Sequence, residues 1–240
     1  MMRSTIFIYR HRILKNDIMV ETPVIIVNYK TYGPSIGRKA LDLTKKIEEI
    51  SEENWAVAPQ TADLRMVSEE TDIPVLSQHI DPIEPGSNTG HVLLETMIDS
   101  GIKGTLINHS EKRLKLSEIE KIVNRCKEND ISTIICANNP EVAAAAAALG
   151  PDFVAYEPPE LIGGDISVSS AKPEVVEEAV KKVNEVDPDV KVLCGAGVKN
   201  GEDVEAAIEL GAEGVLLASG LVKADEKKEV IKDLEKGIKS

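Results

Sequence analysis

Three side chains able to move protons or balance charge each follow a short apolar run of the sequence: Lys30, His109 and Glu157. Lysine is a lasting cation, imidazole exchanges protons near neutrality, and a carboxylate can act as a general base. An amide, Asn28, stands two residues before the lysine. If they meet in one pocket, these groups suit proton transfer beside a carbonyl, with Glu157 as base, His109 as electrophile and Lys30 as counter-charge.

Small residues follow two further apolar runs, as Gly195-Ala196-Gly197 and as Ala218-Ser219. Residues without bulky side chains let backbone N–H groups come close to an anion. We therefore expect these two loops to bind a phosphoryl group, and the substrate to be a phosphorylated carbonyl compound.

The surroundings of the imidazole and the carboxylate support different roles. His109 stands beside Ser110, a residue type favoured at helix N-caps, and a helix N-terminus disfavours imidazolium, so we expect a neutral ring. Glu157 precedes Pro158-Pro159 and, a few residues later, Gly163-Gly164, a layout typical of a lid with a hinge. His79 is interpreted as a structural or interface residue, and His91 as a residue that opens a helix.

From Val24 onward, short apolar runs alternate with longer amphipathic stretches. The runs are predicted strands: Val24–Val27, Trp55–Ala58, Pro74–Ser77, Gly104–Ile107, Ser132–Cys136, Phe153–Tyr156, Val190–Leu193 and Gly214–Leu217. Predicted helices include Ile36–Ile50, Leu116–Asn129, Lys172–Val186, Glu202–Leu210 and Asp225–Gly237, where apolar residues recur every three or four positions. The strands are continuously apolar, which is typical of strands buried on both faces.

Eight strands alternating with helices predict one parallel sheet of the α/β class. This number fits a closed (β/α)8 barrel better than a doubly wound sheet, and no GxGxxG motif follows the first predicted strand. The active site of such a barrel lies at the carboxyl ends of its strands, where the candidate residues stand.

Charge and cysteine content exclude several classes of protein. The chain has 240 residues, with 28 Lys+Arg against 41 Asp+Glu and a formal net charge of −13, which argues against nucleic acid and anionic membranes as partners. No apolar run approaches the roughly 20 residues of a transmembrane helix. Cys126, Cys136 and Cys194 lack metal-site spacing, so we expect buried thiols in a cytoplasmic protein that uses neither a metal nor another cofactor.

Residues 1–18 differ from the rest of the chain, with four Lys/Arg and one Asp. Their apolar stretch is too short for the core of a signal peptide, and a second methionine, Met19, stands just before the first predicted strand. We expect residues 1–18 to be a misassigned start or a dispensable extension, and residues 19–240 to form a single barrel domain.

Nine motifs are spread over the predicted barrel: NYKTY at 28–32, APQ at 58–60, ADLRM at 62–66, QHIDP at 78–82, TGHV at 89–92, NHSE at 108–111, YEPPELIG at 156–163, CGAG at 194–197 and GVLLASG at 214–220. Together they resemble the triosephosphate isomerase family, whose fold is the TIM barrel, and specifically its shorter archaeal-type branch. The resemblance runs from about Pro23 to the C-terminus.

The resemblance implies interconversion of dihydroxyacetone phosphate and D-glyceraldehyde 3-phosphate through an enediolate, in glycolysis and gluconeogenesis. Glu157 would carry the proton between neighbouring carbons, and neutral His109 would polarise the carbonyl. Lys30 would stabilise the negative charge, Asn28 would orient the oxygens, and Glu111 would pair with Lys30.

The resemblance also implies a lid and a subunit contact. A lid over about Pro158–Ile166 would bring Ile162 and the Gly163 N–H to the phosphate and exclude water. At the far end of the lid, archaeal relatives tend to have the sequence Ile-Gly-Thr-Gly, whereas residues 162–165 of this chain are Ile-Gly-Gly-Asp. Because Gly164 and Asp165 replace threonine and glycine, we expect slower lid closure or weaker phosphate binding. Thr89 would reach the Asn28 and Lys30 of a neighbouring subunit in a homodimer or homotetramer.

The main alternative is another phosphate-binding barrel, such as a different sugar-phosphate isomerase, an epimerase or an aldolase. A Schiff-base aldolase needs a lysine in the core of a strand, and a metal-dependent epimerase needs clustered His and Asp ligands; the sequence shows neither. A non-catalytic barrel that serves as a binding or structural protein would be expected to lack Lys30, His109 or Glu157. The sequence therefore favours the isomerase.

Overall fold

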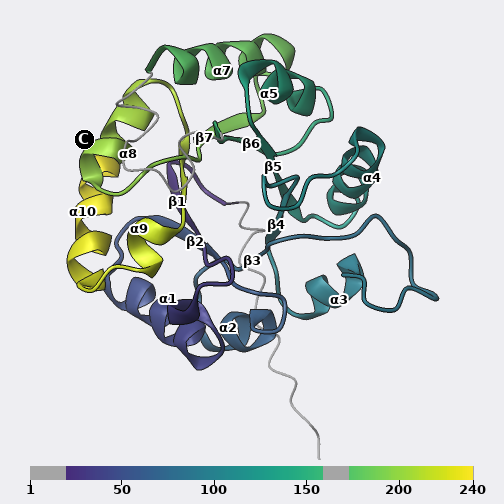
Figure 1. Ribbon diagram of the computed structural model, residues 1–240, viewed down its shortest axis with the longest axis horizontal. Coiled ribbons are helices and arrows are strands. Elements are labelled where there is room, and N and C mark those ends of the chain that lie inside the picture. The colour runs from purple at the N-terminus through teal and green to yellow at the C-terminus, as the bar shows by residue number, and fades with distance from the viewer. Residues whose placement is uncertain (1–19, 159–172, 240) are drawn as a thin grey trace, which may run out of the picture.

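The computed structural model describes residues 20–158 and 173–239, with strands at the centre and helices around them (Figure 1). The predictions for residues 1–18, and for Ile162, Gly163, Gly164 and Asp165 of the lid, lie outside these ranges.

The strands form one parallel sheet that closes on itself. They are β1 (Val24–Asn28), β2 (Asn54–Ala58), β3 (Leu76–Ser77), β4 (Gly104–Ile107), β5 (Ser132–Ala137), β6 (Phe153–Tyr156), β7 (Lys191–Cys194) and β8 (Gly214–Leu217). Their order is β2-β1-β8-β7-β6-β5-β4-β3, and a parallel bridge between Val57 and Val75 joins the two ends. The predicted (β/α)8 barrel of the α/β class is thereby confirmed.

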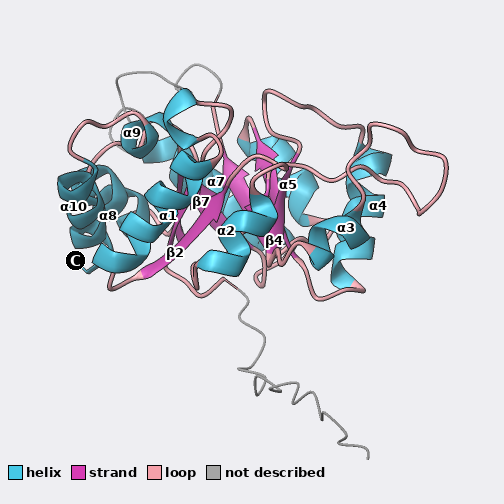
Figure 2. Cartoon of the chain, turned by 90° about the horizontal axis from the view of Figure 1, so that it is seen from below, coloured by secondary structure: helices cyan, strands magenta, loops and turns pink. Residues whose placement is uncertain are grey.

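The helices surround this ring, as Figure 1 shows in end view and Figure 2 from the side. They are α1 (Arg38–Ile50), α2 (Leu64–Glu70), α3 (Leu94–Asp99), α4 (Leu116–Lys127), α5 (Pro140–Ala147), α7 (Pro173–Val186), α8 (Gly201–Glu209), α9 (Ser219–Val222) and α10 (Lys227–Lys239), with a 3-10 turn η1 (Gly33–Ser35). The five helices predicted by their residue ranges are all present, with ends that differ by at most two residues.

Alternate side chains of each strand point into the barrel, as the two-residue period of a strand requires. The interior cluster is apolar and contains Val20, Val24, Ile26, Ala56, Ala58, Leu76, Leu106, Ile134, Cys136, Phe153, Ala155, Leu193 and Leu216. The intervening residues, such as Ile25 and Val27, pack between strands and helices. The same alternation puts Asn28 and Glu157 on the inward side, one step above the apolar interior.

The connection from β3 to α3 is long and extends away from the barrel at the right of Figure 1. We call residues 78–93 the β3–α3 arm. Its base is held by two hydrogen bonds, from Asp81 N to Val92 O (2.9 Å) and from Val92 N to Asp81 Oδ2 (2.6 Å). The arm is therefore shaped by its own contacts as well as by its ends.

Candidate active site

A pocket of about 210 Å³ lies at the carboxyl ends of the strands. It is lined by Asn28, Lys30, Tyr32, His109, Glu111, Glu157, Gly195–Lys199 and Leu216–Gly220. The fold thus brings together the four predicted catalytic residues, Glu111 and both small-residue loops, although these segments are far apart in the sequence.

Glu157 lies at the floor of this pocket, 3% exposed, in the position after β6. Its backbone N–H donates to Ala137 O (2.7 Å), which continues the strand pairing by one residue. Burial raises the pKa of its carboxyl to about 7, while hydrogen bonding with the Cys136 thiol and the charge of Lys30 lower it to a smaller degree. Within the described part of the chain, Glu157 Oε2 meets no hydrogen-bond donor. Such a carboxyl is poised to accept a proton near neutral pH.

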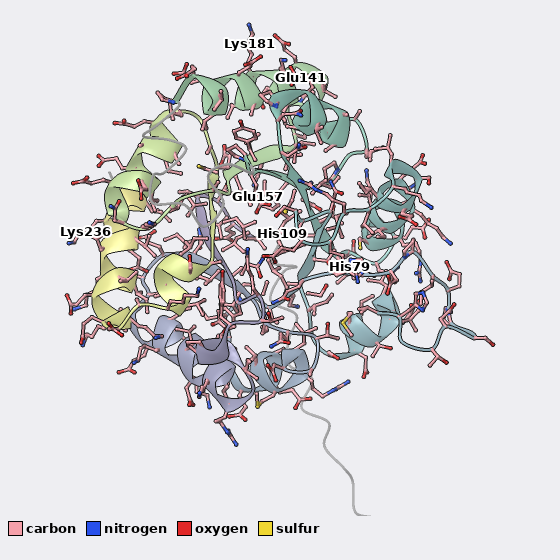
Figure 3. The ribbon with its side chains drawn as sticks, in the orientation of Figure 1. His79, His109, Glu141, Glu157, Lys181 and Lys236 are labelled. Carbon is pink, nitrogen blue, oxygen red and sulfur yellow. The ribbon has the colours of Figure 1, made fainter. Side chains whose placement is uncertain are left out.

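His109 faces this carboxyl, with Nε2 3.6 Å from Glu157 Oε1, and Figure 3 shows the two side chains together at the centre of the barrel. Burial, helped by the nearby charge of Lys30, lowers the pKa of His109 to about 4. Its Nδ1 accepts a hydrogen bond from Glu111 N (3.1 Å), so the proton of the neutral ring is on Nε2. The ring therefore presents an N–H donor to the pocket.

The predicted reason for the neutral imidazole was wrong. His109 does not begin a helix, because α4 starts at Leu116 with Lys115 at its N-cap, and Ser110 lies in a turn. The ring stays neutral because it is buried beside a lysine. The turn depends on Asn108, which has a left-handed backbone (φ 59°) and whose side chain bonds Cys136 O (2.9 Å) and Leu114 N (3.1 Å).

Lys30 approaches the pocket from the turn after β1. Its Nζ lies 3.0 Å from Glu111 Oε1, so the predicted pair between these residues is formed. Its backbone is left-handed (φ 47°), a conformation that costs free energy for a residue with a side chain. Asn28 Oδ1 accepts from Lys30 N (2.9 Å), and Gln78 Nε2 donates to Lys30 O (3.0 Å). These two bonds hold the strained turn.

Gln78 was missed as a site residue by sequence reasoning. The same amide also donates to Ala58 O (2.8 Å), so one side chain ties the β1 turn to the end of β2. The signal available was its place directly after a predicted strand, at the same rim as the other candidates.

The two small-residue loops were predicted to bind a phosphoryl group through their backbone N–H groups, and the structure differs from this prediction at Gly195. Gly195 donates its N–H to Tyr156 O (2.9 Å), so this group is not available to a phosphate, which corrects the expectation for Gly195. A Cβ on Gly195 would lie 2.5 Å from Glu157 Cγ, so the glycine makes room for the base. Ala196 and Gly197 on one side, and Ala218 and Ser219 on the other, remain the candidate phosphate donors, with α9 beginning at Ser219.

Residues outside the pocket fall into three groups. Thr89 is exposed on the β3–α3 arm and does not line the pocket. His79 is buried with Nε2 2.9 Å from Asp81 Oδ1, as expected of a structural residue, whereas His91 lies three residues before α3 and does not open it. All three cysteines are buried thiols, as predicted.

In residues 20–158 and 173–239, no three His, Cys, Asp or Glu side chains gather as metal ligands, and no helix is long and apolar enough to cross a membrane. A Schiff-base aldolase would need a lysine inside the barrel, in the core of a strand. Lys191 is the first residue of β7, at the amino end of that strand, and its Nζ lies 3.3 Å from Thr22 Oγ1. It therefore lies away from the pocket.

The family model and the individual proteins that this chain matches all point to the same family. A family model of triosephosphate isomerase matches residues 23–234, which include every residue that lines the pocket. The triosephosphate isomerases of Methanothermus fervidus and Methanocaldococcus jannaschii are each 57% identical over 218 residues, 90% of this chain and 98% and 100% of those proteins. That of Methanosarcina mazei is 52% identical over 216 residues, 89% of this chain and 97% of that protein.

Proposed function

The chain belongs to the triosephosphate isomerase family and is an isomerase, and we propose that it interconverts dihydroxyacetone phosphate and D-glyceraldehyde 3-phosphate in the pocket described above. The observation that carries this assignment to particular residues is the buried Glu157 carboxyl, with its pKa near 7, facing a neutral His109.

The proton follows a short path. Ionised Glu157 takes it from the carbon next to the carbonyl, which leaves an enediolate, and returns it to the neighbouring carbon. His109 Nε2–H donates to the substrate oxygens as charge develops on them. Because Asn28 Oδ1 already accepts from Lys30 N, the amide nitrogen of Asn28 is the part left to donate to the substrate.

Lys30 and the small loops supply the electrostatic part. The Lys30 ammonium, positioned by Glu111, stabilises the negative charge of the enediolate, and preorganised donors of this kind contribute on the order of 10²–10³ in rate each. Ala196, Gly197, Ala218 and Ser219 bind the phosphoryl group through backbone N–H groups, and Ile162 and Gly163 complete this site from the lid. The reaction belongs to glycolysis and gluconeogenesis in the cytoplasm.

Self-association is part of the same proposal. The β3–α3 arm of one subunit carries Thr89 to Asn28 and Lys30 of another, in a homodimer or homotetramer. The exposure of Thr89 and the internal bonds that shape the arm support this arrangement. Sedimentation of the purified protein tests it, and a monomer at micromolar concentration would contradict it.

A coupled assay on D-glyceraldehyde 3-phosphate tests the catalytic roles, with Glu157→Asp and His109→Gln beside the unchanged protein. The shorter acid withdraws the base, and the amide cannot exchange protons, so each variant is expected to lose about 100-fold or more in kcat. Inactivity of the unchanged protein would overturn the reaction, and full activity of both variants would overturn the roles.

A further inference from the structure

We propose that Asn108 is a positioning residue for the isomerisation, whose side chain fixes the place of the His109 ring relative to the Glu157 carboxyl. The proposal deepens the proposed function and rests on it. Asn108 is buried and does not line the pocket, so it acts on the reaction only through these two neighbours.

The two catalytic side chains come from strands that are not paired with each other. His109 follows β4 and Glu157 follows β6, and β5 lies between these two strands in the barrel. The side chains nevertheless meet at the centre of the barrel, 3.6 Å apart (Figure 3). Their spacing therefore depends on how the ends of β4 and β6 are each joined to the end of β5.

The Asn108 side chain makes the first of these links. Its Nδ2 donates to Cys136 O near the end of β5 (2.9 Å), and its Oδ1 accepts from Leu114 N (3.1 Å), at the far end of the turn. The register of β4 and β5 pairs Ile107 with Ile135, so Asn108 is the next residue along and stands level with Cys136. The amide thus extends the join between the two strands by one residue past the end of β4.

The end of β5 holds Glu157 by two contacts, which make the second link. The Cys136 thiol forms a hydrogen bond with the Glu157 side chain, and Ala137 O accepts from Glu157 N (2.7 Å). The residue whose carbonyl receives the Asn108 amide is therefore the residue whose thiol touches the base. One asparagine joins the turn that carries His109 to the residues that hold Glu157.

The residue type at position 108 supports this role. Asn108 has a left-handed backbone (φ 59°), which glycine adopts without strain and asparagine only at some cost. Glycine would therefore suffice if the turn needed this conformation alone. The amide adds what glycine lacks, a donor and an acceptor that reach two different segments.

Asn108→Gly tests the role. It keeps the left-handed backbone and the carbonyl that accepts from Arg113 Nη1 (2.9 Å), and it removes both side-chain bonds. In the assay on D-glyceraldehyde 3-phosphate, kcat should fall about 10- to 100-fold with KM changed no more than about twofold, because misplacing a catalytic group by about 1 Å costs on the order of 100-fold in rate.

The pH profile separates positioning from a loss of stability. In Asn108→Gly the acid limb of kcat/KM should move up by about 0.5–1 pH unit, because a displaced Cys136 thiol no longer lowers the pKa of Glu157. In a Cys136→Ala background, Asn108→Gly should no longer move this limb, because the thiol through which it acts is absent. A variant that merely loosened the fold would move the limb in neither background.

Asn108→Asp guards against misfolding of the glycine variant. It keeps the acceptor for Leu114 N and lacks the amide donor to Cys136 O, so kcat should again fall at least about tenfold. The matched control is Asn139→Gly, which removes a side-chain bond to Val142 N (2.8 Å) at the start of α5, outside the active-site pocket. It should leave both kcat and the acid limb unchanged.

Three results would each overturn the positioning role: full kcat in Asn108→Gly, an acid limb that does not move in this variant, or an equal movement with and without the Cys136 thiol. Inactivity of the unchanged protein on D-glyceraldehyde 3-phosphate would instead overturn the proposed function.

Discussion

The Glu157 carboxyl, one residue after the end of β6, is tuned by the residues around it. Burial pushes the pKa up to about 7, and the Cys136 thiol and Lys30 limit that rise. The neighbouring imidazole is pushed the other way, to about 4, by the same loss of water. Two groups with their pKa values displaced in opposite directions divide the work, one as base and one as neutral donor.

We expect the pH profile of kcat/KM to follow Glu157 alone between pH 5 and 9. Below pH 7 the free enzyme holds its base protonated, so activity should fall towards tenfold per pH unit, after correction for the substrate dianion. His109, with a pKa of about 4, adds no step in this window. A steady-state pH series checks this, and an acid limb centred below pH 5 would contradict it.

The same shift affects stability. Because burial raises the folded-state pKa from 4.5 to about 7, the folded protein holds this proton more tightly than the unfolded chain. The contribution of this proton to the free energy of unfolding is therefore fully present below pH 4.5, and it is lost as the pH rises through 7. Glu157→Gln should therefore raise the free energy of unfolding at pH 8 by about 1–3 kcal/mol, with little change at pH 4.5.

Urea unfolding at the two pH values measures that difference. The active-site variant Lys30→Gln keeps the buried acid but removes a charge that lowers its pKa, so this comparison variant should lose more stability at pH 8 than at pH 4.5. A gain for Glu157→Gln that is equal at both pH values would refute the linkage to the carboxyl.

Gly195 positions the base by its lack of a side chain. In Gly195→Ala the new Cβ would meet Glu157 Cγ at 2.5 Å, so the carboxyl must move, and a displacement of about 1 Å costs about 100-fold in rate. We expect kcat to fall by that order while the fold is retained. Gly33→Ala, where nothing lies within 4 Å of the added Cβ, is the control, and equal kcat in both variants would exclude this role.

The principal site residues could be predicted from the sequence because each follows a strand. Asn28, Lys30, His109 and Glu157 stand directly after apolar runs, and parallel strands bring such positions to one rim. Gln78 also follows a predicted strand, but its role, like that of Cys136, could not be assigned from that position, because both roles depend on contacts with segments about 20 to 48 residues away. The prediction that Gly195 binds phosphate was wrong for the same reason, because its N–H donates to Tyr156 O on the neighbouring strand.

At the scale of elements, the β3–α3 arm is fastened to α4 by one arginine. Arg125 Nε lies 3.2 Å from Glu84 Oε1, its second nitrogen lies 2.6 Å from Glu95 Oε1, and it also donates to Ile83 O. Its side chain is 12% exposed, whereas those of Glu84 and Glu95 are 65% and 46% exposed, so the arginine end of these contacts is shielded and the carboxylate ends face water.

Arg125→Gln should loosen the arm without unfolding the barrel. We expect amide hydrogen exchange within residues 78–93 to quicken about tenfold, because several charge-assisted bonds are lost. Subunit dissociation should shift to higher protein concentration if the arm carries Thr89 to a partner. Arg65→Gln, an arginine in exposed ion pairs with Asp99 and Glu69, is the control, and the same exchange in both variants would contradict the fastening.

The ends of elements show where sequence patterns reach their limit. The predicted strand from Pro74 is two residues shorter in the structure, because proline lacks an N–H and only its carbonyl joins the sheet, accepting from Val57 N (3.0 Å). The short helices α2, α3 and α9 have too few residues to show a helical period, whereas long helices such as α1 do.

At the scale of the whole molecule, α10 near the end of the chain is tied to the start of β2. Glu235 is 5% exposed and its Oε1 accepts hydrogen bonds from Trp55 Nε1 (2.9 Å), Glu52 N (2.9 Å) and Glu53 N (3.2 Å). One carboxylate oxygen therefore joins segments that are about 180 residues apart in the sequence.

Glu235→Ala should destabilise the barrel as a unit, because it leaves buried donors without an acceptor. We expect a loss of about 2–4 kcal/mol and a fall in Tm of about 5–10 °C, measured by calorimetry. Lys232→Ala, at an exposed position of the same helix, should change Tm by no more than about 1–2 °C. Equal Tm values for the two variants would show that the bonds of Glu235 to the start of β2 do not stabilise the barrel.

The close approach of Gly195 to Glu157 bears on how this chemistry can be inherited or transplanted. A host barrel given Lys30, His109 and Glu157 at matching positions would still lack the base if a larger residue followed its seventh strand. The sixth and seventh strands and their first loop residues form the smallest segment that carries the base intact. Gene duplication, recombination or design would have to move that pair together.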